Sequence, residues 1–345
     1  MPTRNDFRRL FTDGFSESRQ WLDWFLTRVY RDDDLVCLEE GGKAVSGLLL
    51  TPYICDFHGA PLPMGYISCV ATARDERGKG YMARTMRMAL ARAADRDMAI
   101  CSLIPANRRL FFTYDSLGFS TIYYIDEQRY TSLHRFRPAG GFSAVEPDYD
   151  MLAMLERAQG GAVLHTRGQY ECILADLAMD GGRVLACADG AGESAMAFVT
   201  VSDECATVKY LPATSAEAAE AALALVREIA PGRSVVVWGT PGAESRSLRS
   251  RGMARIVNAQ LVLSTLATSY PAIDQTIRLH DSLIAANNGV YILRHGNCDK
   301  VSDTMRRITL DVDISVLTRI LASAPAIGDV FGLPAERPTL QLMLD

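Results

Sequence analysis

The feature that most constrains this chain is the stretch 65–99, which joins three local patterns in one order. An apolar strand over 66–72 comes first, a basic turn with glycines over 77–80 follows, and an amphipathic helix runs over 81–97. The first backbone N–H groups of such a helix have no intrahelical acceptor, and they sit at the positive end of the helix dipole. This order therefore predicts a turn that binds an anion such as a pyrophosphate.

The residues of the turn suit that role. Gly78 and Gly80 allow the main chain to approach a bulky anion, and they tolerate dihedral angles that a side chain disfavours. Arg77 and Lys79 supply positive charge beside it. The helix is predicted from apolar residues at helical spacing, which are Met82, Met86, Ala89, Leu90 and Ala93. A strand, a glycine turn and a helix also occur in proteins without a ligand, so the turn alone leaves both interpretations open.

A second strand and helix follow directly. Residues 98–104 form an apolar run of strand length, which Pro105 stops, and Asn107 stands where a helix N-cap belongs. The predicted helix continues through Tyr114 and closes at Leu117-Gly118-Phe119, with Gly118 as its C-terminal cap. These residues place a tyrosine at a fixed distance in sequence from the anion-binding turn.

Together the two units resemble the GNAT acyltransferase superfamily. Its Arg-x-x-Gly-x-Gly/Ala motif, which binds the pyrophosphate of acetyl-CoA, is matched here by Arg77, Gly80 and Met82, and Tyr-x-x-x-Gly-Phe is matched by Tyr114, Gly118 and Phe119. Met82 departs from the commonest residue at its position. The departure leaves the cradle intact because the contribution of this position is a backbone N–H. The specific part of the resemblance lies between Val70 and Phe119.

Composition narrows the class of protein. The chain has 345 residues, of which 48% are hydrophobic, enough for a core in two or three domains. A net charge of −5 without a cluster of Lys, Arg and aromatic residues argues against nucleic acid as a partner. The polar N-terminus and the lack of an apolar run near about 18 residues predict neither a signal peptide nor a membrane span. We expect a cytoplasmic protein.

Cysteine and histidine usage predicts no metal site. The eight cysteines are scattered singly without a Cys-x-x-Cys pair, and several stand in apolar runs, which favours reduced thiols in the core. The five histidines have neither metal-ligand nor catalytic-triad spacing, so each is interpreted as a surface or core residue.

The chain is predicted to contain three domains. The first covers 1–137 and begins with two short helices within 6–30, followed by strands at 35–38, 44–50 and 53–57 that form an antiparallel meander. A Pro-Ala-Gly-Gly linker at 138–141 leads to the second domain, 142–266, and the third covers 270–345.

The second domain repeats the element order of the first but lacks its motif. A helix near 149–158, strands at 183–188, 195–201 and 206–211, a helix at 216–229 and a strand at 234–238 are expected. After the third of these strands the sequence reads Leu-Pro-Ala-Thr-Ser, without Arg-x-x-Gly-x-Gly. This resembles a degenerate GNAT repeat that has lost its CoA cradle.

The third domain is predicted to be a small α+β unit, with strands at 273–279, 290–294 and 308–312 and a helix at 314–322. With the apolar C-terminal stretch, this architecture resembles GNAT acetyltransferases of the enhanced-intracellular-survival type, whose third domain is sterol-carrier-protein-like. The expected fold is α/β (α+β), with tandem GNAT domains, mixed central sheets and this small C-terminal domain.

The resemblance implies roles for particular residues. A primary amine attacks the thioester of acetyl-CoA, and the backbone edge Cys69-Val70-Ala71 polarises the carbonyl. Tyr114 protonates the departing thiolate and the C-terminal α-carboxylate of Asp345 removes the amine proton. A phenol with a pKa near 10 keeps its proton at neutral pH, whereas an ammonium must lose one before it attacks. Tyr114 could instead be a packed aromatic, and Asp345 a frayed polar end.

The cofactor-binding set implied by the resemblance comprises Cys69, Val70, Ala71, Arg77, Gly78, Lys79, Gly80, Tyr81, Met82 and Asn107. Asn107 either reaches the pantetheine or caps its helix. Asp345 carries two carboxylates, so either its side chain or its α-carboxylate could be the base.

The sequence thus predicts an amine N-acetyltransferase that uses acetyl-CoA, without a metal, on a small amine that is aminoglycoside-like or a polyamine. A homo-oligomer is expected from the resemblance. The alternative is a non-catalytic protein that binds acyl-CoA or lipid.

Overall fold

The computed structural model describes residues 3–242, 245, 247–322, 326–334 and 337–344. Their contacts divide the chain into two compact units, each of which is described by itself. The first contains the N-terminal segment up to residue 122 together with residues 252–336, and the second contains residues 123–251 and 337–344. Both combine helices with strands, and the mixed α/β fold class expected from the sequence is confirmed. None of the described helices has the length and apolar character needed to cross a membrane.

The main sheet of the first unit has the strand order β1-β2-β3-β4-β12. The pairs β1–β2, β2–β3 and β4–β12 are antiparallel, whereas β3 and β4 run parallel because a helix connects them. The strands are β1 (Leu35–Glu40), β2 (Lys43–Phe57), β3 (Ala60–Thr72), β4 (Ile100–Leu103) and β12 (Leu248–Ile256), of which residues 252–256 lie in this unit.

A long hairpin of β2 and β3 organises this sheet. Its two-residue turn is His58-Gly59, and both residues have positive φ, 51° and 80°, the conformation that matches the twist of a tight hairpin. The predicted break between strands near residue 52 is wrong, because β2 continues through Pro52, which pairs with Gly65 of β3. β1 ends its pairing opposite Leu49 and does not reach Pro52, so the missing N–H removes no hydrogen bond to β1.

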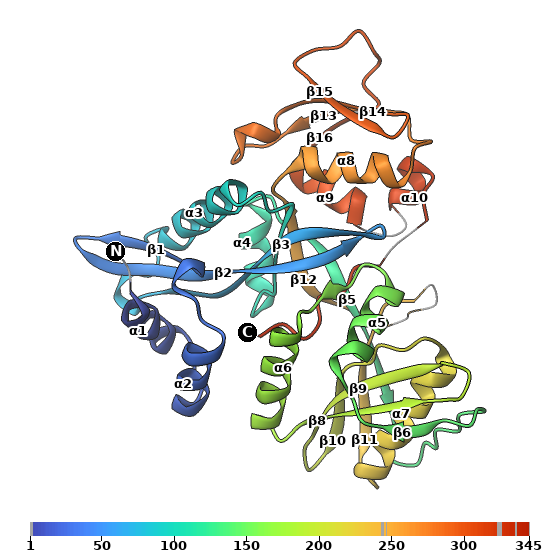
Figure 1. The fold of residues 1–345 in the computed structure, drawn as a ribbon. Coiled ribbons are helices and arrows are strands. Elements are labelled where there is room, and N and C mark those ends of the chain that lie inside the picture. The colour runs from blue at the N-terminus through green and yellow to red at the C-terminus, as the bar shows by residue number, and fades with distance from the viewer. Residues whose placement is uncertain (1–2, 243–244, 246, 323–325, 335–336, 345) are drawn as a thin grey trace. The chain divides into compact units, whose positions relative to one another are not determined.

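Helices cover both faces of the hairpin sheet (Figure 1). On one face, α1 (Arg4–Gly14) and α2 (Arg19–Arg28) bury aromatic side chains such as Phe7 and Phe25. On the other, α3 (Tyr81–Asp95) and α4 (Arg108–Asp115) pack Met86, Leu90 and Tyr114 against the strands. The predicted helices within 6–30, over 81–97 and through Tyr114 are therefore present.

The second segment of the first unit forms a separate small sheet with helices. The sheet has the order β15-β14-β13-β16, and α8 packs against β14 and β15. Its elements are α8 (Ala259–Ser269), β13 (Gln275–His280), β14 (Gly289–Arg294), β15 (Asn297–Val301), β16 (Leu310–Asp313), α9 (Ile314–Ala322) and α10 (Ala326–Phe331).

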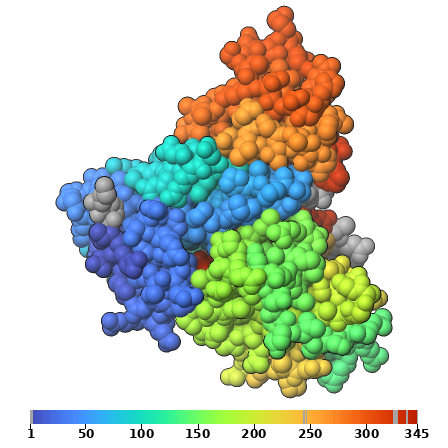
Figure 2. Space-filling model, in the orientation of Figure 1, coloured from blue at the N-terminus to red at the C-terminus, as the bar shows by residue number. Residues whose placement is uncertain are grey.

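This segment is packed directly against the N-terminal segment of the same unit, as the orange atoms against blue and teal ones show in Figure 2. The His58 ring, 7% exposed at the hairpin turn, lies 3.3 Å from the Tyr270 hydroxyl and 3.2 Å from the Leu321 carbonyl oxygen. Ser120 donates a hydrogen bond of 2.7 Å to the carbonyl of Ser315.

A buried ion pair lies within the segment 252–336, and its arginine lies against Gly118 of the N-terminal segment. The Arg255 guanidinium of β12 lies 2.6 Å from a carboxylate oxygen of Asp281, and the two side chains are 1% and 0% exposed. Asp281 also accepts hydrogen bonds from the side chain of Asn287 and from the backbone N–H groups of Leu283 and Ile284. Burial pushes the pKa of Asp281 upward, but Arg255 and these donors outweigh it and hold the pKa below its usual value.

The second unit is built on the strand order β5-β11-β10-β9-β8-β6. β10 and β11 run parallel, and the other neighbouring strands in this order are antiparallel. The strands are β5 (Ser120–Tyr130), of which residues 123–130 lie in this unit, β6 (Ser143–Val145), β8 (Arg183–Ala188), β9 (Ser194–Val201), β10 (Cys205–Tyr210) and β11 (Ser234–Gly239), with a short β7 (Val163–Leu164). The helices are α5 (Tyr149–Gln159), α6 (Arg167–Met179) and α7 (Ala216–Ile229).

We predict that Asp281→Ala lowers the free energy of unfolding by about 3–5 kcal/mol, because it leaves the Arg255 charge buried without its partner. Asp23→Ala is the matched control. Its carboxylate also lies 2.6 Å from a guanidinium, that of Arg8, but is 51% exposed, so we expect a loss of at most about 1 kcal/mol. Denaturant unfolding measures both values, and equal losses would contradict a stabilising role for the buried pair.

The same ion pair makes stability depend on pH. Since the pKa of Asp281 is lowered, its contribution to the free energy of unfolding is present above the unfolded-state pKa, near 3.9, and disappears as pH falls through the folded-state value.

Candidate active site

The predicted anion-binding turn connects the end of β3 to the start of α3. A short 3₁₀ turn, Arg74–Glu76, leads into it, and Gly78 and Gly80 have φ of 80° and 78°. Gly80 is the N-cap of α3, and no side chain accepts a hydrogen bond from the first turn of this helix. The N–H groups of Tyr81 and Met82 therefore point out of the helix end without an intrahelical acceptor.

This open helix start is unusual within the molecule. Every other helix of eight or more residues in the described part of the chain has a Ser, Thr, Asn or Asp side chain that accepts from its first turn. These residues are Thr3, Ser18, Asn107, Asp148, Thr166, Ser215, Asn258 and Asp313. Only α3 among them keeps its first-turn donors clear of a capping side chain, which is the arrangement that an anion needs.

The basic side chains of the turn have protein partners. Arg77 donates from Nε to the Thr72 carbonyl at 3.2 Å and from Nη2 to the Asp13 carbonyl at 3.0 Å, so it ties the turn to the end of β3 and to the end of α1. The Lys79 ammonium lies 2.7 Å from Glu76, and that hydrogen bond raises the pKa of Lys79. Their role toward a ligand stays a prediction. In this structure the turn itself offers backbone N–H groups.

β3 is irregular just before the turn. Its register with β2 shifts by one residue between the pairs Leu49–Ser68 and Gly47–Ala71, which is the mark of a β-bulge. Cys69 lies in this bulge with a φ of 54°, a left-handed conformation that costs a non-glycine residue about 1 to 3 kcal/mol. Bulges and strained dihedral angles are common next to functional sites, where they change the direction in which backbone groups point.

The pairing of β3 with β4 ends before the bulge. The last pair is Ile67 with Leu103, while β3 continues to Thr72. The predicted edge Cys69–Ala71 therefore lies beyond the reach of β4. Cys69 and Ala71 are buried, and the Ala71 carbonyl accepts from Ser46 Oγ at 3.1 Å. A strand that extends past its parallel neighbour presents backbone groups to an extended ligand.

Tyr114 belongs to the core beneath α3 and α4. Its side chain is 5% exposed, and its ring meets that of Phe119 edge to face with centroids 6.1 Å apart. Burial raises the pKa of Tyr114 to about 12, above the value of 10 of an ordinary phenol. Within the described part of the chain, no protein group hydrogen-bonds to its hydroxyl. Tyr114 is thus a packed aromatic with its proton firmly held, and a catalytic role is compatible with that packing.

Asn107 caps α4, as one of its two interpretations predicts. Its carbonyl oxygen accepts from the backbone N–H groups of Arg109 at 3.0 Å and Leu110 at 3.2 Å. The cap uses only that oxygen. A contact from the side-chain nitrogen of Asn107 to a ligand is therefore compatible with capping.

The structure adds Arg255 to the residues around this turn, a residue that the sequence motifs do not include. Gly118 has a φ of 80°, and a Cβ on it would lie 2.1 Å from Nη1 of Arg255. The turn after Tyr114 therefore needs glycine both for its backbone and for the guanidinium above it, while Phe119 N–H donates to the Tyr114 carbonyl at 3.2 Å. An arginine inside the apolar run Met-Ala-Arg-Ile-Val is the signal that could have found this residue.

The predicted base, Asp345, lies outside the described residues. The chain just before it belongs to the second unit, where Leu340, Met343 and Leu344 are buried. Thr339 N–H donates to the Gly161 carbonyl at 2.9 Å. Among the described residues, no group of three or more His, Cys, Asp or Glu side chains is arranged to hold a metal ion, and no two cysteines form a disulfide.

The N-terminal part of the chain matches a known protein family. Residues 3–122 match the family described as Acetyltransferase (GNAT) domain, which ends where the first segment of the first unit ends. GNAT domains use acetyl-CoA as co-substrate. A search of curated proteins gave no match.

Solved structures share the fold over nearly the whole chain. A probable N-acyltransferase from Enterococcus faecalis is 16% identical, with a TM-score of 0.76 over 92% of this chain and 87% of its own. A GCN5-related N-acetyltransferase from Anabaena variabilis is 15% identical, with a TM-score of 0.76 over 98% and 97%. Eis1 from Mycobacterium abscessus is 12% identical, with a TM-score of 0.73 over 98% and 95%.

The strand, turn and helix at 60–95 thus lie in a GNAT acetyltransferase domain. The domain that residues 3–122 match is an acetyltransferase domain, so the protein is an acyltransferase.

Proposed function

We propose that this protein is an N-acetyltransferase that transfers the acetyl group of acetyl-CoA to a primary amine of a small molecule. The observation that carries the proposal is the open N-terminus of α3 at the end of β3, with Tyr114 in the core of the same unit. The resemblance to the enhanced-intracellular-survival type favours an aminoglycoside-like or polyamine acceptor. The similarity in fold to Eis1 supports that type.

The cofactor would be bound by backbone more than by side chains. The N–H groups around Gly78, Gly80, Tyr81 and Met82 would receive the pyrophosphate, where a helix dipole and glycine dihedrals favour an anion. The pantetheine would lie along Cys69-Val70-Ala71, where β3 continues past β4. Arg77 would act chiefly by holding the turn in place through its contacts with Thr72 and Asp13.

The chemistry follows from these positions. The neutral amine nitrogen attacks the thioester carbonyl carbon, a C–N bond forms, and the C–S bond breaks to release CoA. An N–H donor on the β3 edge would stabilise the oxygen of the tetrahedral intermediate, and Tyr114 would donate to the departing sulfur. With a pKa of about 12, Tyr114 is a weaker acid than a thiol near 8.5, so full proton transfer from it is uphill. Its first contribution is therefore a hydrogen bond to the developing thiolate.

We also propose that the second unit is the degenerate GNAT repeat. In support, β10 leads through a turn into α7 and runs parallel to β11, as β3 leads into α3 and runs parallel to β4. The difference lies in the helix start, because Ser215 Oγ accepts from Ala218 N–H at 3.2 Å and occupies the first turn of α7. On this account the chain binds one acetyl-CoA, in the first unit.

The remaining expectations from the resemblance stay proposals. They are a sterol-carrier-protein-like domain at 270–345, a cytoplasmic location and a homo-oligomer. Sedimentation of the full chain tests the last of these, and a single monomeric species would remove it.

We predict that the wild-type chain releases free CoA thiol only when an acceptor amine is present, and that Tyr114→Phe lowers kcat by about a hundredfold or more while the KM for acetyl-CoA changes little. The phenylalanine keeps the packing against Phe119 and removes only the hydroxyl. A thiol-trapping assay over a panel of aminoglycosides and polyamines measures both. Unchanged turnover in Tyr114→Phe would exclude the hydroxyl, and CoA binding without amine-dependent release would favour the non-catalytic alternative.

The base is tested by separating the two carboxylates of Asp345. If the α-carboxylate accepts the amine proton, Asp345→Asn keeps wild-type turnover, whereas extension of the chain by two glycines, which moves the α-carboxylate, lowers kcat by about a hundredfold. If the side chain is the base, Asp345→Asn lowers kcat and the extended chain keeps wild-type turnover. Wild-type turnover in both variants, or in a chain that lacks Leu344 and Asp345, would contradict a C-terminal base.

A further inference from the structure

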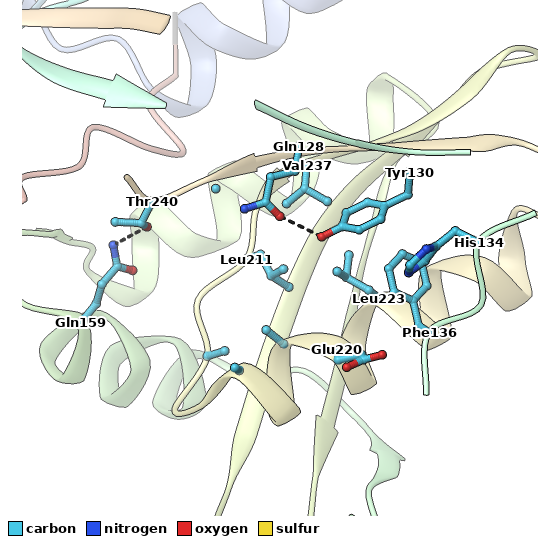
Figure 3. Close-up of a pocket in the computed structure, with 14 residues that line it drawn as sticks. Gln128, Tyr130, His134, Phe136, Gln159, Leu211, Glu220, Leu223, Val237 and Thr240 are labelled. Carbon is cyan, nitrogen blue, oxygen red and sulfur yellow. Dashed lines mark hydrogen bonds between the residues drawn. The ribbon is translucent and has the colours of Figure 1, made fainter. Parts of the chain in front are cut away.

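The second unit contains a cavity of about 700 Å³ that the proposed acetyl transfer does not use (Figure 3). It lies between β5 and β11 on one side and α7 on the other, the helix that corresponds to α3 in the proposed repeat. A cavity of this size accommodates a small organic molecule. The residues that line it indicate what kind of molecule would bind.

One wall of the cavity is aromatic. The Tyr130 ring lies with its centroid 5.0 Å from that of Phe136 and 4.8 Å from that of His134, and the latter two are 4.7 Å apart. Tyr130 is oriented by a hydrogen bond of 2.8 Å from its hydroxyl to Gln128 Oε1. Aromatic faces of this kind attract cations, because the ring quadrupole is negative above its plane.

A carboxylate stands at the aromatic end. Glu220 extends from α7 on the side of the rings, whereas Gln159 and Thr240 lie at the opposite end of the cavity (Figure 3). One oxygen of Glu220 accepts from the backbone N–H of Arg137 at 2.7 Å, which fixes the side chain and leaves acceptor capacity on the carboxylate. Of the residues that line the described cavity, Glu220 is the only carboxylate, and none is Lys or Arg.

The N-terminal end of α7 disfavours an anion. Its first turn is capped by Ser215, and Thr214 beside it donates from Oγ1 to Glu193 at 2.8 Å. The connection 211–215 contains a proline and no glycine, so it cannot form the close backbone cradle seen at Gly78 and Gly80. A CoA pyrophosphate therefore lacks here the two glycines and the uncapped helix start that α3 offers.

We propose that this cavity binds an organic cation, an ammonium group joined to an apolar body. The ammonium would lie between Glu220, the face of Tyr130 and the face of Phe136 opposite the Arg227 guanidinium, which lies 5.8 Å from the Phe136 centroid and does not line the cavity. The apolar body would pack on Leu211, Leu223 and Val237. The inference concerns binding alone, so it holds or fails independently of acetyl transfer. A quaternary ammonium is the suitable probe because it has no N–H to lose and is no acceptor for an acetyl group.

The test is a calorimetric titration of the full chain with benzyltrimethylammonium, with benzyl alcohol and phenylacetate as neutral and anionic comparators. We expect one equivalent of the cation to bind, with an affinity at least about tenfold above those of both comparators. Glu220→Gln should weaken binding by about tenfold, since glutamine still accepts from Arg137 N–H but carries no charge. Glu217→Gln, one turn earlier on α7 and exposed, is the matched control and should bind as the wild type does.

Phe136→Leu is a second variant, which keeps the cavity apolar but removes a ring face. It should weaken binding of the cation more than binding of the two comparators. Thermal unfolding of each variant establishes that it is folded before titration. The proposal is overturned if the wild type does not bind the cation at millimolar concentration. Equal affinity for benzyl alcohol, or equal affinity of Glu220→Gln and wild type, also overturns it.

Discussion

A helix that begins on a left-handed glycine, with no side chain over its first turn, is the constraint on which the site depends. Folded helices normally satisfy their first N–H groups with a capping side chain, and the other helices of eight or more residues described here do so. At α3 no side chain accepts from these donors, and on our proposal they receive the pyrophosphate. Gly80 keeps the approach clear because no atom lies within 4 Å of the position its Cβ would take. The bulge at Cys69 and the early end of β4 extend the same opening along β3.

The site also depends on residues distant in sequence. Arg255 lies over Gly118, directly after the tyrosine helix, and is held by Asp281 in the segment 252–336. The buried pair of the segment 252–336 thus lies against the turn after Tyr114 in the N-terminal segment, although the second unit separates the two segments in sequence. On our proposal the second unit repeats the strand and helix order of the first, but it has a capped helix start and a carboxylate in its cavity. One architecture can therefore serve an anionic ligand in one unit and, on our proposal, a cationic ligand in the other.

Local patterns in the sequence predicted much of this fold. The spacing of apolar residues predicted α3, α7 and α9 within a few residues, and the motif located the turn at Gly78 and Gly80. The pattern missed α6, α8 and β12, because their burial depends on partners distant in sequence. It also divided β2 at Pro52, since a proline signals a break unless one knows that β1 ends before it. The apolar run around Arg255 indicates a buried arginine, but its partners Asp281 and Gly118 are distant in sequence, so local pattern could not predict its role.

The central claim is that acetyl-CoA binds at the open start of α3. Its most direct test is the calorimetric affinity of CoA for Gly80→Ala and for Gly59→Ala. Both glycines have φ near 80°, and at each the position that a Cβ would take has no atom within 4 Å. The two variants therefore carry the same backbone strain, and only one lies in the cradle. We predict one CoA per wild-type chain, affinity reduced about tenfold or more in Gly80→Ala, and wild-type affinity in Gly59→Ala. Equal affinities in the two variants would contradict the account.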